Sequence, residues 1–470
     1  MTMAREHAAE RPGPGWWFEG RILRPLLLFA GAVIVAAGPW LVSIAALAVI
    51  TVYMEPVMGR SAVEDLRLTV IYAFCLAPLT AGPIGTIASR AVGHGAAGPQ
   101  ARAASDVFAA AAALAGAVTV VLATGLAAML GIGPPGLRIA FVFLCAAAAQ
   151  LWIVFAVLAA LKMHGFLIFA FLIAMGAATL GVVVAADRTP TTEGLVWIFN
   201  AGILICCALC GARIRRAGPA RARFPDALRI LLRDLARHRE LALGVLCAIA
   251  TVWVDKWVLW FGPSGSRSAA GFYHYAPYDS VMFLAHITIV PLFAGLILFH
   301  EGELSQAVAA FRHRLSDGST RAAIRQAATD LAHGISGSLS GILVFQAALT
   351  ACFVLASPMT TRLLDLGFEQ ILTLRTGLFA VFLHGVVFLA AMIVLLANRV
   401  RLYLVFMFGA LALNLGFSAL SVLISGTAAG GFFTAMLVAA AVGSVVAWRS
   451  LLAFDYFALL GENDGLYTPR

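Results

Sequence analysis

The stretch Trp253-Val254-Asp255-Lys256-Trp257-Val258-Leu259-Trp260 places an acidic and a basic residue among three tryptophans, inside the otherwise apolar run 241–261. A helix that spans a bilayer needs about 20 mostly apolar residues, and this run has that length. A charge at the centre of such a helix costs about 2.5–3.5 kcal/mol on insertion scales, so it usually faces a partner or a water-filled cavity. The stretch therefore predicts a transmembrane helix that carries part of a functional site.

The rest of the chain has the same hydrophobic character. Hydrophobic residues make up 62% and charged residues 12% of the 470 positions, whereas soluble domains are roughly half apolar and about a quarter charged. Twelve runs are long enough to cross a bilayer, and they lie near residues 26–50, 66–88, 107–131, 137–161, 163–185, 195–211, 241–261, 280–300, 335–357, 376–397, 401–424 and 431–453. We expect an all-α integral membrane protein with about twelve transmembrane helices.

The basic residues between these runs predict the orientation of the chain. With the N-terminus placed in the cytoplasm, 24 Lys and Arg residues fall on the cytoplasmic side and seven on the outer side. Cytoplasmic loops of membrane proteins carry an excess of Lys and Arg, so both termini are expected in the cytoplasm. Topology thus explains the net charge of +9, and no nucleic-acid-binding module is present.

A basic loop divides the twelve runs into two groups of six. Within it, residues 224–235 have apolar side chains at helical spacing, which is typical of an interfacial helix. Two roles stay open for this loop: a linker attracted to anionic lipid, and a docking site for a cytoplasmic partner. The expected parts are a cytoplasmic N-terminal segment (1–25), a first six-helix half (26–211), a basic cytoplasmic linker (212–240), a second six-helix half (241–460) with a mixed-charge cytoplasmic segment (301–333), and a cytoplasmic tail (461–470).

The two charges of the quoted stretch have different expected environments. At about 100° per residue, Trp253, Trp257 and Trp260 share one face, Lys256 flanks it and Asp255 points nearly opposite, so the charges are not expected to share a partner. The tryptophans fit either an aromatic belt or a substrate path, and Lys256 fits either snorkelling to the interface or the path. A short carboxylate snorkels poorly, so Asp255 is expected to have a buried partner or a pathway role.

An aromatic segment, residues 271–280, follows this helix. Tyr273, Tyr275, Tyr278 and Asp279 could line a path for sugars, because aromatic rings stack on the apolar face of a pyranose while hydroxyl and carboxylate groups bond to its edge. The same residues also fit an ordinary interfacial loop. Asp279 could instead cap the next helix by accepting from backbone N–H groups.

Proline and glycine interrupt several predicted helices at membrane depth. Gly38-Pro39, Gly82-Pro83 and Pro291 are candidates for hinges or cavity lining, with a static kink as the alternative. Arg90, at the cytoplasmic end of the second run, is a candidate gate residue or topology anchor.

The sequence contains no motif for catalysis or for a cofactor. A phosphate-binding glycine loop, a nucleophile elbow and an HExxH zinc motif are all missing. The seven cysteines lie within apolar runs, so neither a disulfide framework nor a metal site is expected. We expect a transporter subunit rather than an enzyme, with no cofactor.

Four blocks in order resemble the PelG family, the polytopic inner-membrane proteins of the Pel exopolysaccharide machinery. They are Ala36-Ala37-Gly38-Pro39-Trp40-Leu41-Val42-Ser43-Ile44, Thr80-Ala81-Gly82-Pro83 with Ser89-Arg90, Asp255-Lys256-Trp257, and Tyr278-Asp279-Ser280-Val281-Met282-Phe283-Leu284-Ala285 leading to Ile289-Val290-Pro291. The similarity covers about residues 15–300 and thins in the last four predicted helices.

The resemblance implies a twelve-helix fold like that of the multidrug and oligosaccharidyl-lipid exporter (MATE-like) superfamily in the bacterial inner membrane. It also implies partners: a Pel-type glycosyltransferase in the cytoplasm, a cyclic-di-GMP receptor and a helical-repeat membrane protein. The implied role is conduction of a nascent, N-acetylgalactosamine-rich polysaccharide. The rival interpretations are an ion-coupled exporter or lipid-linked sugar flippase with Asp255 as the coupling residue, a membrane glycosyltransferase, and a structural scaffold.

Overall fold

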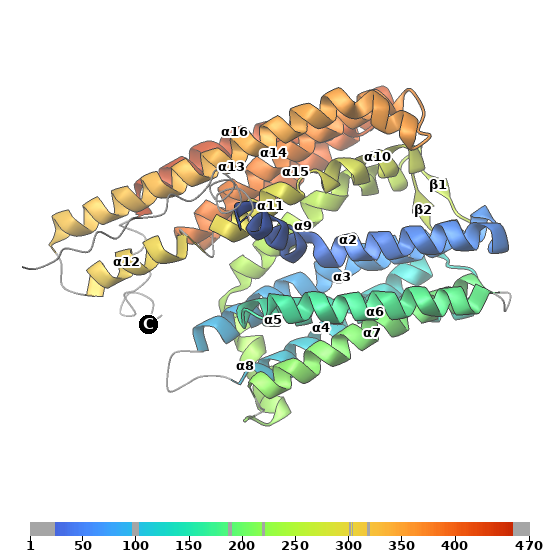
Figure 1. Ribbon diagram of the computed structural model, residues 1–470, viewed down its shortest axis with the longest axis horizontal. Helices are drawn as coiled ribbons and strands as arrows, with labels where there is room; N and C mark the ends of the chain where they lie inside the picture. The colour runs from blue at the N-terminus through green and yellow to red at the C-terminus, as the bar shows by residue number, and fades with distance from the viewer. Residues whose placement is uncertain are drawn as a thin grey trace, which may run out of the picture.

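The computed structural model describes residues 24–95, 103–186, 190–218, 221–299, 302, 304–316 and 320–454. These residues are almost entirely helical (Figure 1). The elements are α2 (Arg24–Met58), α3 (Arg60–Gly95), α4 (Ala104–Leu130), α5 (Pro135–Ala160), α6 (His164–Ala185), α7 (Thr192–Ala217), α8 (Phe224–Arg237), α9 (Arg239–Trp260), β1 (Ser266–Arg267), β2 (Tyr273–His274), α10 (Ala276–Ile287), α11 (Val290–Phe299), α12 (Ser305–Ser316), α13 (Arg321–Leu363), α14 (Gln370–Leu396), α15 (Val400–Ser425) and α16 (Ala429–Leu452).

The membrane-spanning pattern predicted from the sequence is confirmed. Eleven helices in the described part of the chain are long and apolar enough to cross a membrane, and the part of α2 from Val42 to Met58 is a shorter apolar helix. Each of the twelve predicted runs lies on a helix, with α10 and α11 together forming the eighth. The predicted N-terminal segment before residue 24 and the tail 461–470 lie outside the described residues.

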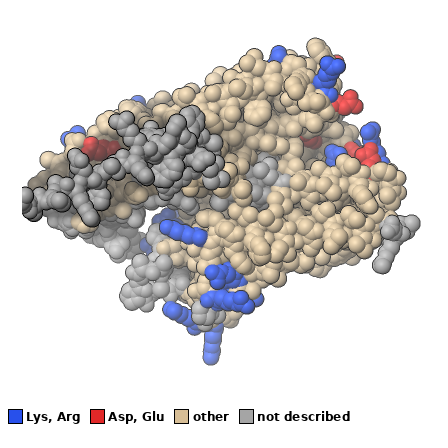
Figure 2. Space-filling view, in the orientation of Figure 1, with Lys and Arg blue, Asp and Glu red and all other residues tan. Residues whose placement is uncertain are grey.

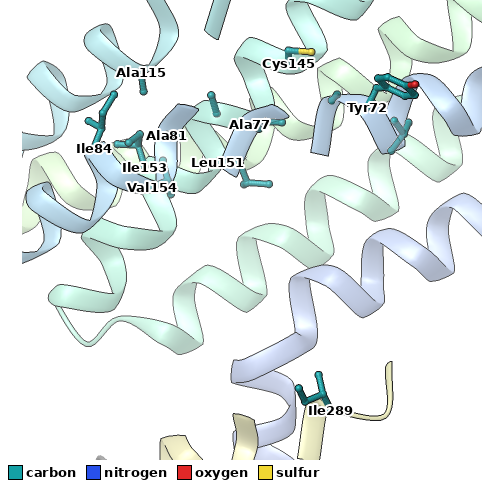
Figure 3. Packing of buried hydrophobic residues seen from close by; sticks show 14 of the residues in the cluster. Tyr72, Ala77, Ala81, Ile84, Ala115, Cys145, Leu151, Ile153, Val154 and Ile289 are labelled. Atoms are coloured by element: carbon teal, nitrogen blue, oxygen red, sulfur yellow. The ribbon is translucent and has the colours of Figure 1, made fainter. Parts of the chain in front are cut away.

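The helices of the first half, α2 to α7, pack through small side chains. On α3, Ala77 and Ala81 are fully buried, and a Cβ atom at Gly85 would lie 3.1 Å from the Cβ of Ala156 on α5. Small residues let helix backbones approach closely, which is how helices associate inside a bilayer. Figure 3 shows Ala81 of α3 beside Ile153 and Val154 of α5.

The helices of the second half, α9 to α16, pack chiefly with each other, α14 against α16 and α9 against α15. A buried polar bond joins the second pair, because Asn414 Nδ2 donates to the Thr251 carbonyl at 2.8 Å. Contacts of α3 with α9 and of α2 with α11 connect this half to the first. In Figure 1, α13 and α16 diverge from the helices of the first half with distance from the β1–β2 hairpin.

The eighth span is broken in its middle. Helix α10 ends at Ile287 and α11 begins at Val290, just before Pro291, which has no N–H to continue the helical bonding. The free carbonyl of Thr288 accepts from Gln346 Nε2 of α13 at 2.7 Å, and Gln346 is fully buried. A neighbouring helix thus supplies the hydrogen bond that the carbonyl at the break lacks, as a non-helical backbone at membrane depth requires.

The two ends of the bundle differ in structure. At one end, the connection between α9 and α10 forms the β1–β2 hairpin, here called the hairpin (residues 266–274). At the other end, α8 packs against α4 and lies across the ends of the spans, and Lys and Arg side chains gather around it (Figures 1 and 2). We refer to these as the hairpin end and the α8 end.

Candidate functional site

The two charges of α9 form a buried ion pair. Lys256 Nζ lies 3.2 Å from Asp255 Oδ2 and donates a further bond to the Val252 carbonyl at 2.9 Å. Asp255 is 0% exposed and Lys256 is 8% exposed. The helical wheel gave no indication that the two charges would pair with each other, which they do because the long lysine side chain bends back along its own helix to reach the carboxylate. Lys256 therefore does not extend toward the interface.

Two further bonds connect the end of α9 to the start of α10. The hydroxyl of Tyr278 donates to Asp255 Oδ2 at 2.7 Å, and Trp260 Nε1 donates to both carboxylate oxygens of Asp279 at 2.9 and 3.0 Å. Asp279, in the first turn of α10, also accepts from the backbone N–H of the N-cap residue Tyr275 at 3.0 Å, as the acidic member of a capping box does. The polar side chains therefore fix the two helix ends between which the hairpin is held.

Trp260 belongs to an aromatic cluster rather than to a lipid-facing belt. Its ring is buried and stacks on Tyr72 of α3, with ring centroids 4.9 Å apart. Phe272, in the hairpin, is fully buried between Tyr72 (5.1 Å) and Phe141 of α5 (5.7 Å). The hairpin thus inserts an aromatic side chain of the second half into the core of the first.

Backbone atoms of the hairpin bond directly to the first half. The Ala270 N–H donates to Asp65 Oδ1 (3.1 Å), and the Ala270 carbonyl accepts from the Gly133 N–H (3.1 Å). The Tyr72 hydroxyl donates to the Tyr273 carbonyl at 2.7 Å. Arg267 Nη2 donates to the Leu130 carbonyl at 2.6 Å, at the C-terminus of α4, where a cation interacts favourably with the helix dipole.

The hairpin needs a glycine at position 271 because its backbone lies close to the backbone of the first half there. Gly271 has a φ of +105°, and a Cβ atom there would lie 3.1 Å from the Gly131 carbonyl oxygen. Any other residue would be strained in this conformation and would crowd the first half. Nearby, His274 Nε2 lies 3.3 Å from Glu64 Oε1, which adds a side-chain contact between the halves.

Two histidines lie near the ion pair. The Phe432 ring of α16 stacks with His286 of α10, meets His384 of α14 edge-on, and lies with its centroid 6.0 Å from Lys256 Nζ. His286 Nδ1 is 2.7 Å from the Met282 carbonyl. Among the residues that the structure describes, no three His, Cys, Asp or Glu side chains group as a metal site would require.

The remaining predicted path residues are half-buried. Trp253, Trp257, Tyr273 and Tyr275 all pack at the edge of the hydrophobic core. Their rings are therefore less enclosed than those of Tyr278 and Trp260, both of which are buried.

Of the predicted hinge and gate residues, Pro291 lies at the break between α10 and α11, and the others lie on continuous helices. Helix α2 runs through Gly38-Pro39, whose side chains lie outside the described part, and α3 runs through Gly82-Pro83. A Cβ atom at Gly82 would lie 2.5 Å from Ile249 Cδ1 of α9, so Gly82 sits at the contact between the halves. Arg90 is exposed near the end of α3, at the α8 end.

Sequence reasoning missed the first-half partners of the hairpin. Asp65, Tyr72 and Phe141 lie on helices whose apolar character gave no sign of a role, and Phe272 was not separated from the aromatic segment around it. The one available signal was the pair of acidic residues Glu64-Asp65 just before a predicted span, on the same side as Arg267.

This geometry describes a membrane bundle whose halves are bonded together at one end. The model of the family described as PelG, "Putative exopolysaccharide Exporter (EPS-E)", matches residues 20–458. The chain belongs to this family. The membership confirms the resemblance seen in the four sequence blocks. It also extends that resemblance through the last four helices, which contain none of the four blocks.

Solved structures of MATE transporters share the fold. A MATE in the bent conformation has a TM-score of 0.59 at 14% identity and covers 93% of this chain and 97% of its own. A MATE in the straight conformation has a TM-score of 0.60 at 12% identity, covering 91% and 96%. A MOP superfamily transporter from Pyrococcus furiosus has a TM-score of 0.56 at 14% identity, covering 91% and 96%. A search of curated proteins gave no match. The MATE-like fold expected from the resemblance is confirmed.

Proposed function

We propose that this chain conducts a nascent exopolysaccharide across the bacterial inner membrane, through a path between its two halves. Membership in an exopolysaccharide exporter family and the MATE-like transporter fold support membrane transport. The observation that carries the proposal is the hairpin, which bonds the two halves together by backbone and side-chain contacts. A path between the halves can open at that end only when these bonds break.

In this proposal the α8 end faces the cytoplasm and the hairpin end faces outward, with both termini cytoplasmic. The excess of basic residues around α8 supports this orientation. The polymer is Pel-like and rich in N-acetylgalactosamine. A cytoplasmic glycosyltransferase, a cyclic-di-GMP receptor and a helical-repeat membrane protein assemble with the chain, as its family resemblance implies.

The predicted path residues divide into two roles. Lys256 and Tyr278 both bond to Asp255, Trp260 bonds to Asp279, and these bonds position the hairpin. The half-buried rings stack on sugars once the hairpin has left the first half. They are Trp253, Trp257 and Tyr275, together with Tyr273, which moves with the hairpin. A polymer path should hold each sugar weakly, since a site that binds must also release.

A second candidate is an ion-coupled exporter or flippase of lipid-linked oligosaccharides. The observation that favours it is the burial of Asp255 beside Lys256, because charged residues inside membranes commonly serve ion or proton pathways. In this mechanism Asp255 would carry the coupling ion, which would compete with Lys256 and Tyr278 for its carboxylate.

Deletion of the gene in its native cell distinguishes the two candidates. A conducting subunit that works with a glycosyltransferase should leave no surface polymer and no accumulated lipid-linked sugar. A flippase should instead leave lipid-linked oligosaccharide on the inner leaflet, detectable by extraction into organic solvent. Transport by the purified chain alone in liposomes, driven by a proton or sodium gradient, would contradict the conducting-subunit proposal.

A further inference from the structure

The residues around α8 form an arginine-rich surface. Nine arginines and no lysine fall within residues 213–240, against three acidic residues, which leaves a net charge of +6. All nine arginine side chains are exposed. They belong to Arg213, Arg215, Arg216, Arg221, Arg223, Arg229, Arg233, Arg237 and Arg239. Figure 2 shows this concentration of basic side chains at the α8 end.

Helix α8 has three faces along its length. Ala227 and Leu231 are buried where the helix packs against α4. Beside this packed face, Phe224 and Leu232 form an apolar flank. Both side chains are large, yet they are 48% and 46% exposed. The row beyond these carries Arg229, Arg233 and Arg237. An apolar flank thus lies uncovered between the packed face and the basic face.

The surface is held rigidly against the bundle. Asp106, in the first turn of α4, accepts from the backbone N–H groups of Arg221 and Ala222 at 3.0 to 3.2 Å. The Ser105 N–H also donates to the Gly218 carbonyl at 3.1 Å. A cavity of about 190 Å³ remains between α8 and α4, lined mainly by apolar side chains with Asp106 and Arg221 among them.

We propose that this surface, made of α8 and the end of α7, is a binding site for anionic phospholipid in the leaflet on its side of the membrane. The helix lies at the ends of the spans, where the uncovered Phe224 and Leu232 can enter the boundary between headgroups and acyl chains. Arginines beside that flank then lie at the depth of the phosphates, which a guanidinium binds through two parallel hydrogen bonds.

The chemistry favours lipid over a soluble anion or a protein. A free phosphate or a nucleotide diphosphate would use the arginines but would leave the apolar flank uncovered. A protein partner could cover both, whereas lipid needs no second protein, because α8 packs against α4, one of the helices long and apolar enough to span the membrane.

Lipid binding to the purified full-length chain tests the site. In detergent with equal amounts of phosphatidylglycerol and phosphatidylcholine, native mass spectrometry should find phosphatidylglycerol retained preferentially. Arg229→Gln and Arg233→Gln should each lower that preference about fivefold, since a basic residue at an anionic surface contributes about that factor. Leu232→Gln should weaken retention of both lipids. Arg325→Gln, which removes an exposed arginine of α13 far along the chain, is the matched control and should change nothing.

Three outcomes would overturn the inference. One is equal retention of the two lipids by the wild-type chain. Another is displacement of bound phosphatidylglycerol by millimolar inorganic phosphate or UDP, which would identify a soluble phosphate site. The third is unchanged lipid retention in the Arg229→Gln/Arg233→Gln variant together with loss of a co-purifying glycosyltransferase, which would identify a protein-docking surface. Because lipid retention is measured without transport, these results do not depend on the proposed export function.

Discussion

The hairpin end and the α8 end use polar groups in opposite ways. At the hairpin end, charges of both signs are present, and backbone groups, Asp65 and Arg267 bond across the two halves around the buried Phe272. At the α8 end, a net charge of +6 stays at the surface; the backbone N–H groups of Arg221 and Ala222 bond to Asp106 of α4 in the first half, and Glu240 at the end of the linker pairs with Arg401 of α15. In the proposed mechanism the halves therefore separate at the hairpin end, whereas the α8 end anchors the bundle in its membrane.

The largest expected effect comes from breaking the Asp255–Lys256 pair, on which the hairpin end depends. Replacing Lys256 by Met leaves the Asp255 carboxylate buried with Tyr278 as its hydrogen-bond donor. Removing one partner of a buried ion pair costs about 3–5 kcal/mol of the free energy of unfolding. Thermal unfolding of the purified variant in detergent should show this loss.

The double variant Asp255→Leu/Lys256→Met distinguishes a structural role of the ion pair from a role in transport. Replacing a whole buried pair by apolar side chains is often close to neutral for stability. If the pair only supports the fold, the double variant should regain most of the lost stability and should secrete polymer. Restored stability without secretion would instead show that the charges act in transport, as the ion-coupled candidate requires.

A smaller effect is expected at Asp65, which receives the hairpin backbone. Asp65→Ala removes a hydrogen bond to a charged acceptor, and such bonds contribute about 1.5–3 kcal/mol. The loss should weaken the closed state more than the fold, so a cysteine introduced at Ala270 should react faster with a membrane-impermeant maleimide. Glu55→Ala is the matched control, because Glu55 pairs with exposed Arg60 at the same end and does not contact the hairpin. Equal labelling rates in both variants would contradict the role given to Asp65.

The smallest effect is expected at Tyr72. Tyr72→Phe keeps the stack on Trp260 but removes the bond to the Tyr273 carbonyl. A neutral hydrogen bond contributes about 0.5–1.5 kcal/mol net, so labelling at Ala270 should rise about two- to tenfold. No change would mean that the aromatic stack alone holds the hairpin at this point.

Much of the fold could be predicted from the sequence, because a bilayer imposes a length and a composition on every helix that crosses it. Asp255 was correctly expected to have a buried partner, but the partner was missed. A helical wheel places neighbouring residues 100° apart and ignores the four methylenes with which Lys256 reaches back to the carboxylate. The hairpin contacts could not be predicted, since Asp65 and Ala270 are 205 residues apart in sequence and meet only after both halves fold.

A disulfide between the hairpin and the first half tests the central claim most directly. With the seven native cysteines replaced by alanine, Gly133→Cys and Ala270→Cys place thiols where the two backbones already share a hydrogen bond of 3.1 Å. The controls are the two single variants, Gly133→Cys and Ala270→Cys, each in the same cysteine-free background; neither can form the cross-link, and both should secrete polymer under the same oxidation. The account predicts that oxidation of the double variant stops polymer secretion and that reduction restores it. Full secretion by the oxidised, cross-linked protein would contradict the claim that the hairpin must leave the first half for the path to open.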